Sequence, residues 1–361
     1  MERESALESA YKFGAGRYHQ QRGAVALAGE EAARLGRKRA YLLAGPTAFA
    51  LAGARLCSSL EAENISYVTF LYSGQCSVEQ AHLCARDAAA QGCGIIFGIG
   101  GGRVLDLAKV TARIAGLPVI TVPTISATSA PFTHMSVMYT PDGHWVGTWY
   151  LPNEVNAVLA DMDFLSQQPK RYLASGAVDA MAKWMEICHP RPEDALRPGG
   201  DTLLARLIAR QVFDRLALLA PKVYAAEKPE EADLWEVCFL SMAGAAMVSG
   251  TARCLRQSAL AHAVYEWARR FRPKEVKDAL HGEIVGVGLR AQGLFNGDPL
   301  MTQTLENTLH ALRMPMTLAD LGLSDPEKDA GRIAAWMSEA TALVPPERQA
   351  DFARAAAGMN R

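Results

Sequence analysis

The sequence has no paired cysteines, no excess of either charge and no long apolar run. Its seven cysteines are scattered, and none forms a Cys-x-x-Cys pair. That pattern excludes a disulfide framework and a zinc ribbon. Lys and Arg number 37 against 38 Asp and Glu. Neither nucleic acid nor an anionic membrane is therefore expected as the main partner.

Signals for membranes and export are also missing. No apolar run reaches the roughly 18 residues of a membrane span. The N-terminal stretch MERESALESAYKFGAG is polar and lacks the apolar core of a signal peptide. We therefore expect a protein of the reducing cytoplasm without membrane contact.

The first half of the chain alternates short apolar runs with helix-like stretches. With 361 residues, the chain is long enough for two domains. Strands are expected at residues 39–45, 65–74, 94–102, 117–124 and 156–165, and helices at 47–63, 77–91 and 104–115. This alternation predicts a parallel sheet covered on both faces.

The second half has a different sequence pattern, with helix-period stretches in place of strand-like runs, and this pattern begins near residues 161–168. Helices are expected at residues 174–188, 202–219, 231–249, 258–270 and 281–294, and loops at Pro190, Pro192 and Pro198 and between Pro221 and Pro229. We therefore predict an α/β domain over residues 1–165 and an all-α domain over residues 166–361.

A glycine-rich turn follows the third expected strand, in the stretch GIIFGIGGGRVLDLAKV. Gly100, Gly101 and Gly102 let the backbone approach a ligand closely. A helix that starts near Arg103 would direct free N–H groups at a phosphate. The spacing is not the usual GxGxxG, and a tight turn that requires glycine is the alternative.

Hydroxyl groups are dense in the next segment, TVPTISATSAPFTHMSVMYTPDG, which follows an apolar strand directly. At the carboxyl end of a parallel strand, such side chains lie where open α/β sheets bind their ligands. The alternative is ordinary turn chemistry, which Ser and Thr also favour.

Asp179 lies in the helical stretch GAVDAMAKWME, on one face with Lys183 and Glu186. Local spacing favours a solvated charged stripe, because an Asp four residues before a Lys is a common surface pair. His262 lies in an apolar helix, where a structural core histidine is the usual interpretation, and His281 opens the stretch HGEIVGVGL. None of the three carries a local metal signature such as HExxH.

Taken together, five motifs resemble one family. The stretches GIGGGRVLDLAKV, VPTISATSAPFTHMSVMYT, GAVDAMAKW, LAHAV and LHGEIVGVGL occur in the order and spacing of the iron-type, metal-dependent alcohol dehydrogenases. The branch with glycerol dehydrogenase and hydroxycarboxylate dehydrogenases is the most similar. The resemblance covers nearly the whole chain. It implies a Rossmann-like N-terminal domain, a helical C-terminal domain with the site in the cleft, a small-molecule substrate and a homo-oligomer.

The resemblance also implies a set of site residues. Asp179, His262 and His281 would bind one divalent metal at a catalytic site, with Asp179 buried close to both histidines. Zn²⁺ fits these ligands, as Fe²⁺ and Ni²⁺ also would. NAD or NADP would carry the hydride. The residues that would face this cofactor are Gly100, Gly101, Gly102, Arg103, Asp106, Thr124, Thr128, Thr133, Met135 and Tyr139.

Ser129 departs from the family pattern and bears on the substrate. Glycerol dehydrogenases carry an Asp there that binds the polyol, and such a charge would repel an anion. The sequence therefore favours a 2-oxo or 2-hydroxy acid that is reduced or oxidised at the metal. The alternatives are a glycerol or other polyol dehydrogenase, a cyclase similar to dehydroquinate synthase, and a binding protein on a decayed dehydrogenase fold.

Other departures concern the metal motifs and the cofactor. Tyr265 stands where the family often has a second His, and Lys183 stands where a four-ligand branch has a metal-binding His. A protonated lysine cannot bind metal. The segment after the first strand, starting at Gly45, has no acid for the adenine ribose, so NADP(H) is permitted. The basic run Arg269, Arg270 and Arg272 is either a solvated turn or a source of a carboxylate-binding Arg.

Overall fold

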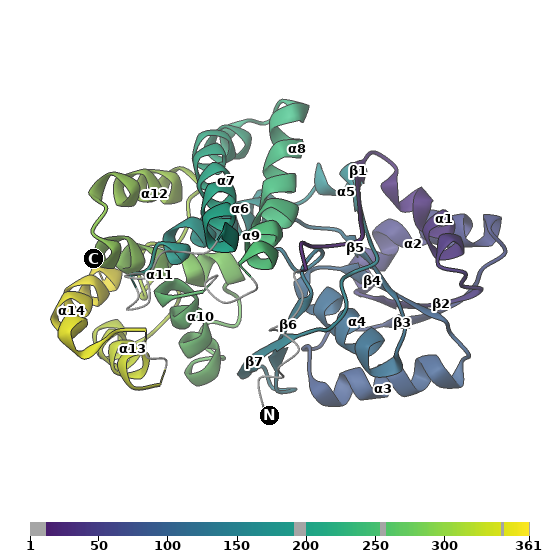
Figure 1. Cartoon of the computed structure of the whole chain (residues 1–361), viewed down its shortest axis with the longest axis horizontal. Coiled ribbons are helices and arrows are strands. Elements are labelled where there is room, and N and C mark those ends of the chain that lie inside the picture. The colour runs from purple at the N-terminus through teal and green to yellow at the C-terminus, as the bar shows by residue number, and fades with distance from the viewer. Residues whose placement is uncertain (1–11, 191–199, 253–257, 341–342, 361) are drawn as a thin grey trace. The chain divides into compact units, whose positions relative to one another are not determined.

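The computed structural model describes residues 12–190, 200–252, 258–340 and 343–360. The chain divides into two compact units, Met1–Pro169 and Lys170–Arg361. Figure 1 shows a sheet with covering helices in the first unit and helices in the second.

A six-stranded parallel sheet organises the first unit. Its order is β1 (Arg17–Gln21), β8 (Ala157–Asp161), β5 (Val119–Pro123), β4 (Ile95–Gly100), β2 (Arg39–Ala44) and β3 (Ser66–Leu71). All five strands expected from the apolar runs form, and the predicted α/β fold is confirmed. β1 was not expected, because its sequence RYHQQ is polar, and it lies at the edge of the sheet, where polar residues are tolerated.

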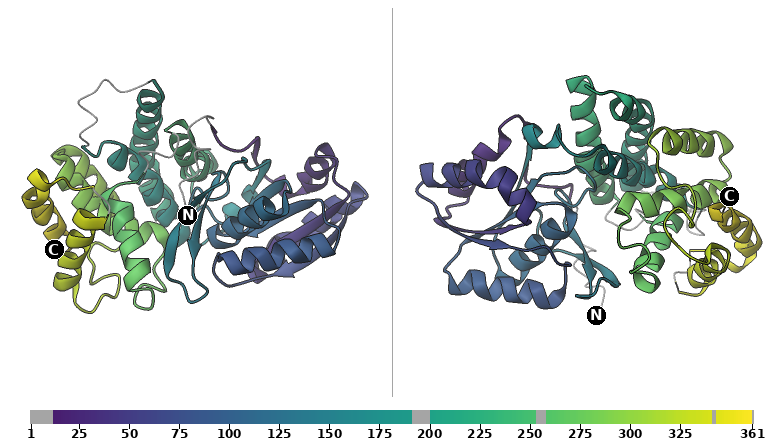
Figure 2. Two further views of the ribbon diagram at one scale, coloured as in Figure 1. Left: turned by 60° about the horizontal axis from the view of Figure 1, so that its bottom comes forward. Right: turned by 180° about the vertical axis from the view of Figure 1, so that it is seen from behind.

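Helices cover both faces of this sheet, as Figures 1 and 2 show: α1 (Ala28–Arg34) and α2 (Pro46–Ala62) on one side, α3 (Val78–Ala90) and α4 (Gly102–Ala115) on the other. Short helical turns η2 (Ala24–Leu27) and α5 (Met162–Leu165) flank β1 and β8. The core consists of fully buried strand residues such as Leu42, Phe97, Ile120 and Leu159, which pack against α2. Burial on both faces explains why these strands read as continuous apolar runs.

The hydroxyl-rich segment leads into an antiparallel hairpin that sequence reasoning missed. Its strands are β6 (Met135–Tyr139) and β7 (Trp145–Tyr150), and they form a separate two-stranded sheet.

The described residues of the second unit form helices and loops. Its helices are α6 (Lys170–Ile187), α7 (Gly200–Ala225), α8 (Glu231–Phe239), the π-helical turn η4 (Leu240–Gly244), α9 (Ala245–Thr251), α10 (Leu260–Phe271), α11 (His281–Asn296), α12 (Pro299–Ala311), α13 (Pro326–Ala340), η5 (Pro346–Arg348), α14 (Gln349–Ala357) and η6 (Gly358–Asn360).

The proline-based loop predictions have mixed outcomes. The linker expected to begin at Pro221 is wrong, because α7 continues through this residue to Ala225. Pro192 and Pro198 lie outside the described residues.

α6 lies at the centre of the second unit and packs against α7 and α11. Gly282 makes the close approach of α11 possible, since a Cβ there would lie 1.9 Å from the Ser175 backbone oxygen. The Gly282 N–H instead donates a hydrogen bond of 3.0 Å to the Ser175 hydroxyl. This contact brings the start of α11 beside the middle of α6.

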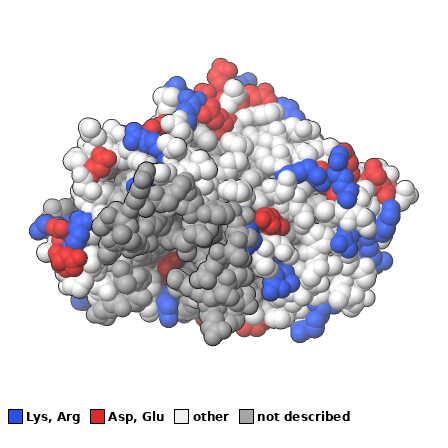
Figure 3. All heavy atoms as spheres, in the orientation of Figure 1, with Lys and Arg blue, Asp and Glu red and all other residues white. Residues whose placement is uncertain are grey.

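One helical stretch in the described residues, Glu231–Thr251, is long and apolar enough to cross a membrane by length and composition. Every 18-residue window of this stretch contains Glu236, so the expectation that no continuous apolar run reaches this length is not contradicted. Within the fold, 72% of its apolar window is buried, as in the core helix of a helical domain. Charged side chains of both signs are interspersed on the face drawn in Figure 3, in line with the balanced composition.

Candidate metal centre

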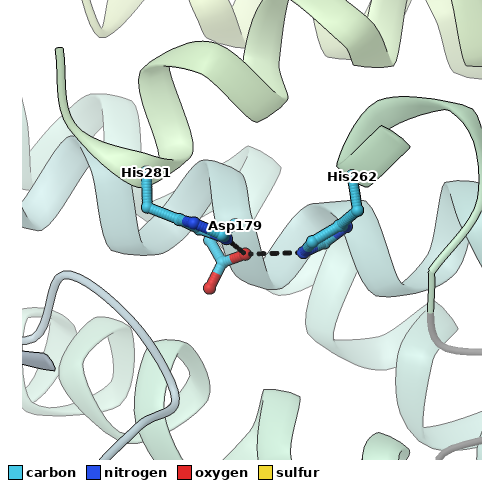
Figure 4. Close-up of side chains that lie close together, drawn as sticks. All are labelled: Asp179, His262 and His281. Carbon is cyan, nitrogen blue, oxygen red and sulfur yellow. Dashed lines mark ion pairs between the residues drawn. The ribbon is translucent and has the colours of Figure 1, made fainter. Parts of the chain in front are cut away.

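Three side chains from three helices converge in the second unit. Asp179 comes from the middle of α6, His262 from the first turn of α10, and His281 from the first position of α11. Asp179 Oδ1 lies 3.4 Å from His262 Nε2 and 3.2 Å from His281 Nε2, as Figure 4 shows. The ligand atoms of all three residues lie within 4.8 Å of one another. The structure thus brings together the three residues expected to bind metal.

The chemistry of this cluster fits a divalent metal ion. Asp179 is 3% exposed, and its Oδ1 has no hydrogen-bond partner although both imidazole nitrogens are near. A buried carboxylate oxygen without a donor is costly, and a cation coordinated by the same three atoms would satisfy it. Burial alone would raise the pKa of Asp179, but the two histidines and the charge of Lys183 hold this pKa well below its ordinary value. The carboxylate is therefore in the state that metal binding requires.

Glu186 contacts His262 at Nδ1, the ring nitrogen that does not face Asp179. Its Oε2 lies 2.5 Å from His262 Nδ1, and its Oε1 accepts the backbone N–H groups of Ala259 at 2.7 Å and His262 at 2.9 Å. A carboxylate on Nδ1 directs Nε2 of the same ring at the metal position. Burial alone would lower the pKa of His262, but Glu186 and Asp179 raise it to about 9 in the metal-free protein.

The interpretation of Glu186 as part of an ordinary charged helix face is wrong, and so is that interpretation of Lys183, for which a turn toward the cleft was the alternative. Lys183 is 4% exposed and Glu186 is fully buried, because the neighbouring helices enclose α6. The i, i+4, i+7 spacing therefore marks an internal polar face. The available signal was a Glu two turns after Asp179 in a stretch that, apart from Lys183, consists of Ala, Met and Trp.

Contacts at His281 show what Tyr265 does at the position where the family often has a second His. The Tyr265 ring meets the His281 ring edge-on, with centroids 4.1 Å apart, and so packs against a candidate metal ligand. The position of His281 is further defined by Glu283, which accepts the Leu280 N–H at 2.7 Å and pairs with Arg171.

The basic run after α10 has structural partners. Arg272 donates to Asp329 at 2.8 Å, and Arg269 donates to the Ala279 backbone oxygen at 2.6 Å. Arg269 also stacks over the Tyr265 ring. These contacts bind the loop after α10 to its surroundings and do not single out a cation for a substrate.

The glycine turn in the first unit brings several predicted cofactor residues together. β4 ends at Gly100, where φ is +148°, and α4 begins at Gly102. The Thr124 N–H donates to the Gly100 backbone oxygen at 3.2 Å, and a Cβ on Gly102 would lie 3.1 Å from the Thr128 hydroxyl. No side chain caps the start of α4, and Arg103 is exposed beside it. This arrangement is typical of a phosphate site at a helix N-terminus.

Lys109 holds the hydroxyl-rich segment in place. This role was not predicted from the sequence. Its buried ammonium donates to the backbone oxygens of Ala130 at 2.8 Å, Thr133 at 3.1 Å and Met135, and it pairs with Asp106 Oδ1 at 2.9 Å. A Lys three residues after an Asp in a helix was the available signal.

Asp106 itself is engaged inside the first unit. Its Oδ2 accepts the Val137 N–H at 3.0 Å and its Oδ1 faces Lys109. It therefore ties α4 to β6, and contact with the cofactor stays a prediction. The Tyr139 N–H donates to the Cys76 backbone oxygen at 2.8 Å. Ser129 is buried, and its backbone oxygen accepts the N–H groups of the residues at 132 and 133.

A family model and individual relatives that match this chain belong to similar dehydrogenases. The model of a protein family described as "Iron-containing alcohol dehydrogenase" matches residues 15–163. Glycerol dehydrogenase from Escherichia coli O6:H1 is 31% identical over 273 residues, which cover 73% of this chain and 72% of that protein. Hydroxycarboxylate dehydrogenase A from Escherichia coli K12 is 28% identical over 288 residues, with 78% and 77% covered.

A solved structure shows the same fold over almost the whole chain. The crystal structure of a probable glycerol dehydrogenase from Sinorhizobium meliloti 1021 superposes with a TM-score of 0.84 at 23% identity. The match covers 97% of this chain and 98% of that one.

Proposed function

This chain belongs to the iron-containing alcohol dehydrogenase family, and on that premise we propose that it oxidises, reversibly, a small alcohol with a second oxygen function beside the reacting hydroxyl. The enzyme is a metal-dependent, NAD(P)-linked alcohol dehydrogenase. The observation that carries the proposal is the convergence of Asp179, His262 and His281 on one point. Glycerol and related polyols are the first candidate substrates, because glycerol dehydrogenases are prominent among the similar proteins. These names support the polyol better than the 2-hydroxy acid favoured by the sequence.

When bound, the divalent metal would supply a Lewis acid for the substrate oxygen, and the nicotinamide would accept or return the hydride. Asp179 contributes one negative charge to the metal position and the two imidazoles contribute none. Glu186 holds His262 in one orientation through its Nδ1. The burial of Asp179 and His262 excludes bulk water and strengthens their interactions with charge at this point.

The first unit would hold the dinucleotide. The glycine turn at Gly100–Gly102 and the uncapped start of α4 suit the pyrophosphate. Lys109 fixes the backbone of the segment that carries Thr128 and Ser129. α2 begins at Pro46 directly after β2, without an acid at the strand end, so both NAD and NADP stay candidates.

A 2-hydroxy acid is the second candidate substrate. Ser129 is the residue that favours it, because a hydroxyl does not repel a carboxylate as an aspartate would. Hydroxycarboxylate dehydrogenase A is also among the similar proteins.

An absorbance assay at 340 nm tests the proposal. Protein stripped of metal and reloaded with Zn²⁺, Fe²⁺ or Ni²⁺ is given NAD⁺ or NADP⁺ with polyols or 2-hydroxy acids. We expect reduced dinucleotide only with metal present, and its loss on chelation. The matched variant Asp179→Asn should lose activity by several orders of magnitude while it still binds dinucleotide, since the dinucleotide residues lie in the other unit. Full activity of the stripped protein, or of Asp179→Asn, would exclude the proposed metal role.

The homo-oligomer and the cytoplasmic location stay predictions. Light scattering after size-exclusion chromatography tests the first, and fractionation of the source cells tests the second.

A further inference from the structure

Lys183 is a buried cation beside the metal centre. It lies one turn after Asp179 on α6 and nearly one turn before Glu186, so the three side chains share one helix face. Residues at this spacing have Cβ atoms about 5–6 Å apart. The charge of Lys183 acts on all three neighbours: it lowers the pKa of Asp179 and of Glu186 and opposes the protonation of His262. Lys183 is only 4% exposed.

The Lys183 ammonium lacks a dedicated partner. Within the described part of the chain it forms no hydrogen bond and no ion pair. Lys109, another buried lysine, has three backbone oxygens and a carboxylate around it. Arg269 and Arg272 are likewise engaged. The Lys183 Nζ can therefore donate to a ligand that supplies an acceptor.

A bound divalent ion would leave one positive charge in excess among itself, Asp179, Glu186 and Lys183. A divalent ion between neutral imidazoles would bring two positive charges, which Asp179 and Glu186 offset. Lys183 then adds one more positive charge.

On the premise of the function proposed above, we propose that Lys183 binds the carboxylate of the substrate and determines a preference for small 2-hydroxy acids over neutral polyols. This reverses the order of the two candidates. The ammonium would satisfy its own hydrogen bonds through the substrate, and the carboxylate would supply the missing negative charge. A polyol can accept a hydrogen bond from Lys183 but cannot balance its charge.

Glycerate and glycerol form a matched pair of probes, because they differ only by a carboxylate in place of one hydroxymethyl group. Each is titrated calorimetrically into metal-loaded wild type, Lys183→Met and Lys183→Arg, with metal content measured for every sample. Lys183→Met keeps the apolar stem without the charge. We expect its glycerate Kd to rise roughly ten- to hundredfold and its glycerol Kd to change less than about threefold. Lys183→Arg should restore much of the glycerate affinity.

Lys222→Met serves as the control for loss of a lysine elsewhere in this unit, since Lys222 is exposed on α7. It should change neither Kd. Steady-state kinetics on the same proteins should show the loss for glycerate mainly in KM.

Several results would overturn the inference. Equal weakening of both probes in Lys183→Met would indicate a structural role, and unchanged glycerate binding would exclude contact with the carboxylate. Absence of glycerate binding to wild type would also exclude it. If Lys183→Met does not fold, two ligands are compared on the wild-type protein instead. Glyceramide, the neutral amide of glycerate, should bind at least about tenfold more weakly than glycerate. Failure of the proposed function would be seen separately, as no reduction of the dinucleotide with either compound, whatever their affinities.

Discussion

At the scale of single residues, Glu186 and Lys183 define the surroundings of the candidate metal centre. Asp179, His262 and His281 would bring the ligand atoms, while Glu186 contacts one imidazole and Lys183 adds a positive charge. The ligand triad could be predicted from the order of the motifs in the chain. Glu186 and Lys183 could not, because their i+7 and i+4 spacing from Asp179 is identical on a solvated and on a buried helix face.

Glu186→Gln tests the supporting contact. The amide keeps the size of the side chain but loses the negative charge behind His262 Nδ1, so the imidazole becomes a weaker ligand. We expect metal affinity to fall by about 10- to 100-fold, measured by competition with a chromogenic chelator.

The matched control is Glu236→Gln, which removes a carboxylate paired with Arg215 at a half-exposed position of the same unit. It should leave metal affinity unchanged. Equal metal affinity of Glu186→Gln and wild type would contradict the supporting role.

At the scale of elements, the junction of β4 and α4 leaves little room between the strand and the helix. Five strands were predictable because parallel strands buried on both faces are continuous apolar runs. β1 was not, because an edge strand needs only one neighbour and tolerates polar residues. The β6–β7 hairpin was masked by hydroxyls that also favour turns.

Gly98→Ala tests the packing of α4 on β4. A Cβ at this position would lie 2.6 Å from Ala108 Cβ, so α4 must move away from the strand. We expect a loss of about 1–3 kcal/mol in the free energy of unfolding and weaker binding of dinucleotide, measured by urea denaturation and by quenching of tryptophan fluorescence.

Gly147→Ala in β7 is the matched control, since a Cβ there meets nothing within 4 Å. It should be close to neutral in both measurements. A neutral result for Gly98→Ala would show that the close approach of helix and strand is not required.

At the scale of the whole molecule, stability should fall in acid because of buried His134. Burial, with the charges of Lys12 and Lys109, lowers the pKa of His134 to about 4. An unfolded histidine titrates near 6.5. As the pH falls below 6.5, His134 therefore takes up a proton in the unfolded chain. In the folded chain it does so only near pH 4. The stability from His134 is complete above pH 6.5 and is lost as the pH falls through this window.

His134→Gln should make this loss shallower, by on the order of one to three kcal/mol between pH 7 and pH 4.5. The free energy of urea unfolding is compared for wild type and variant, both stripped of metal so that the other histidines contribute equally. Parallel pH profiles for the two proteins would refute the role of His134.

The sequence alone determined the family, the α/β and helical halves, and the three candidate ligands. Those features depend on periodicity and on the order of motifs, which are local or nearly local properties of the chain. Tertiary structure alone decided that the face of α6 with Asp179, Lys183 and Glu186 is internal, that Lys109 holds the hydroxyl-rich segment, and that Arg269 and Arg272 serve the fold. The physical reason is that burial of a charge depends on which helices surround it, and residues distant in the chain decide that.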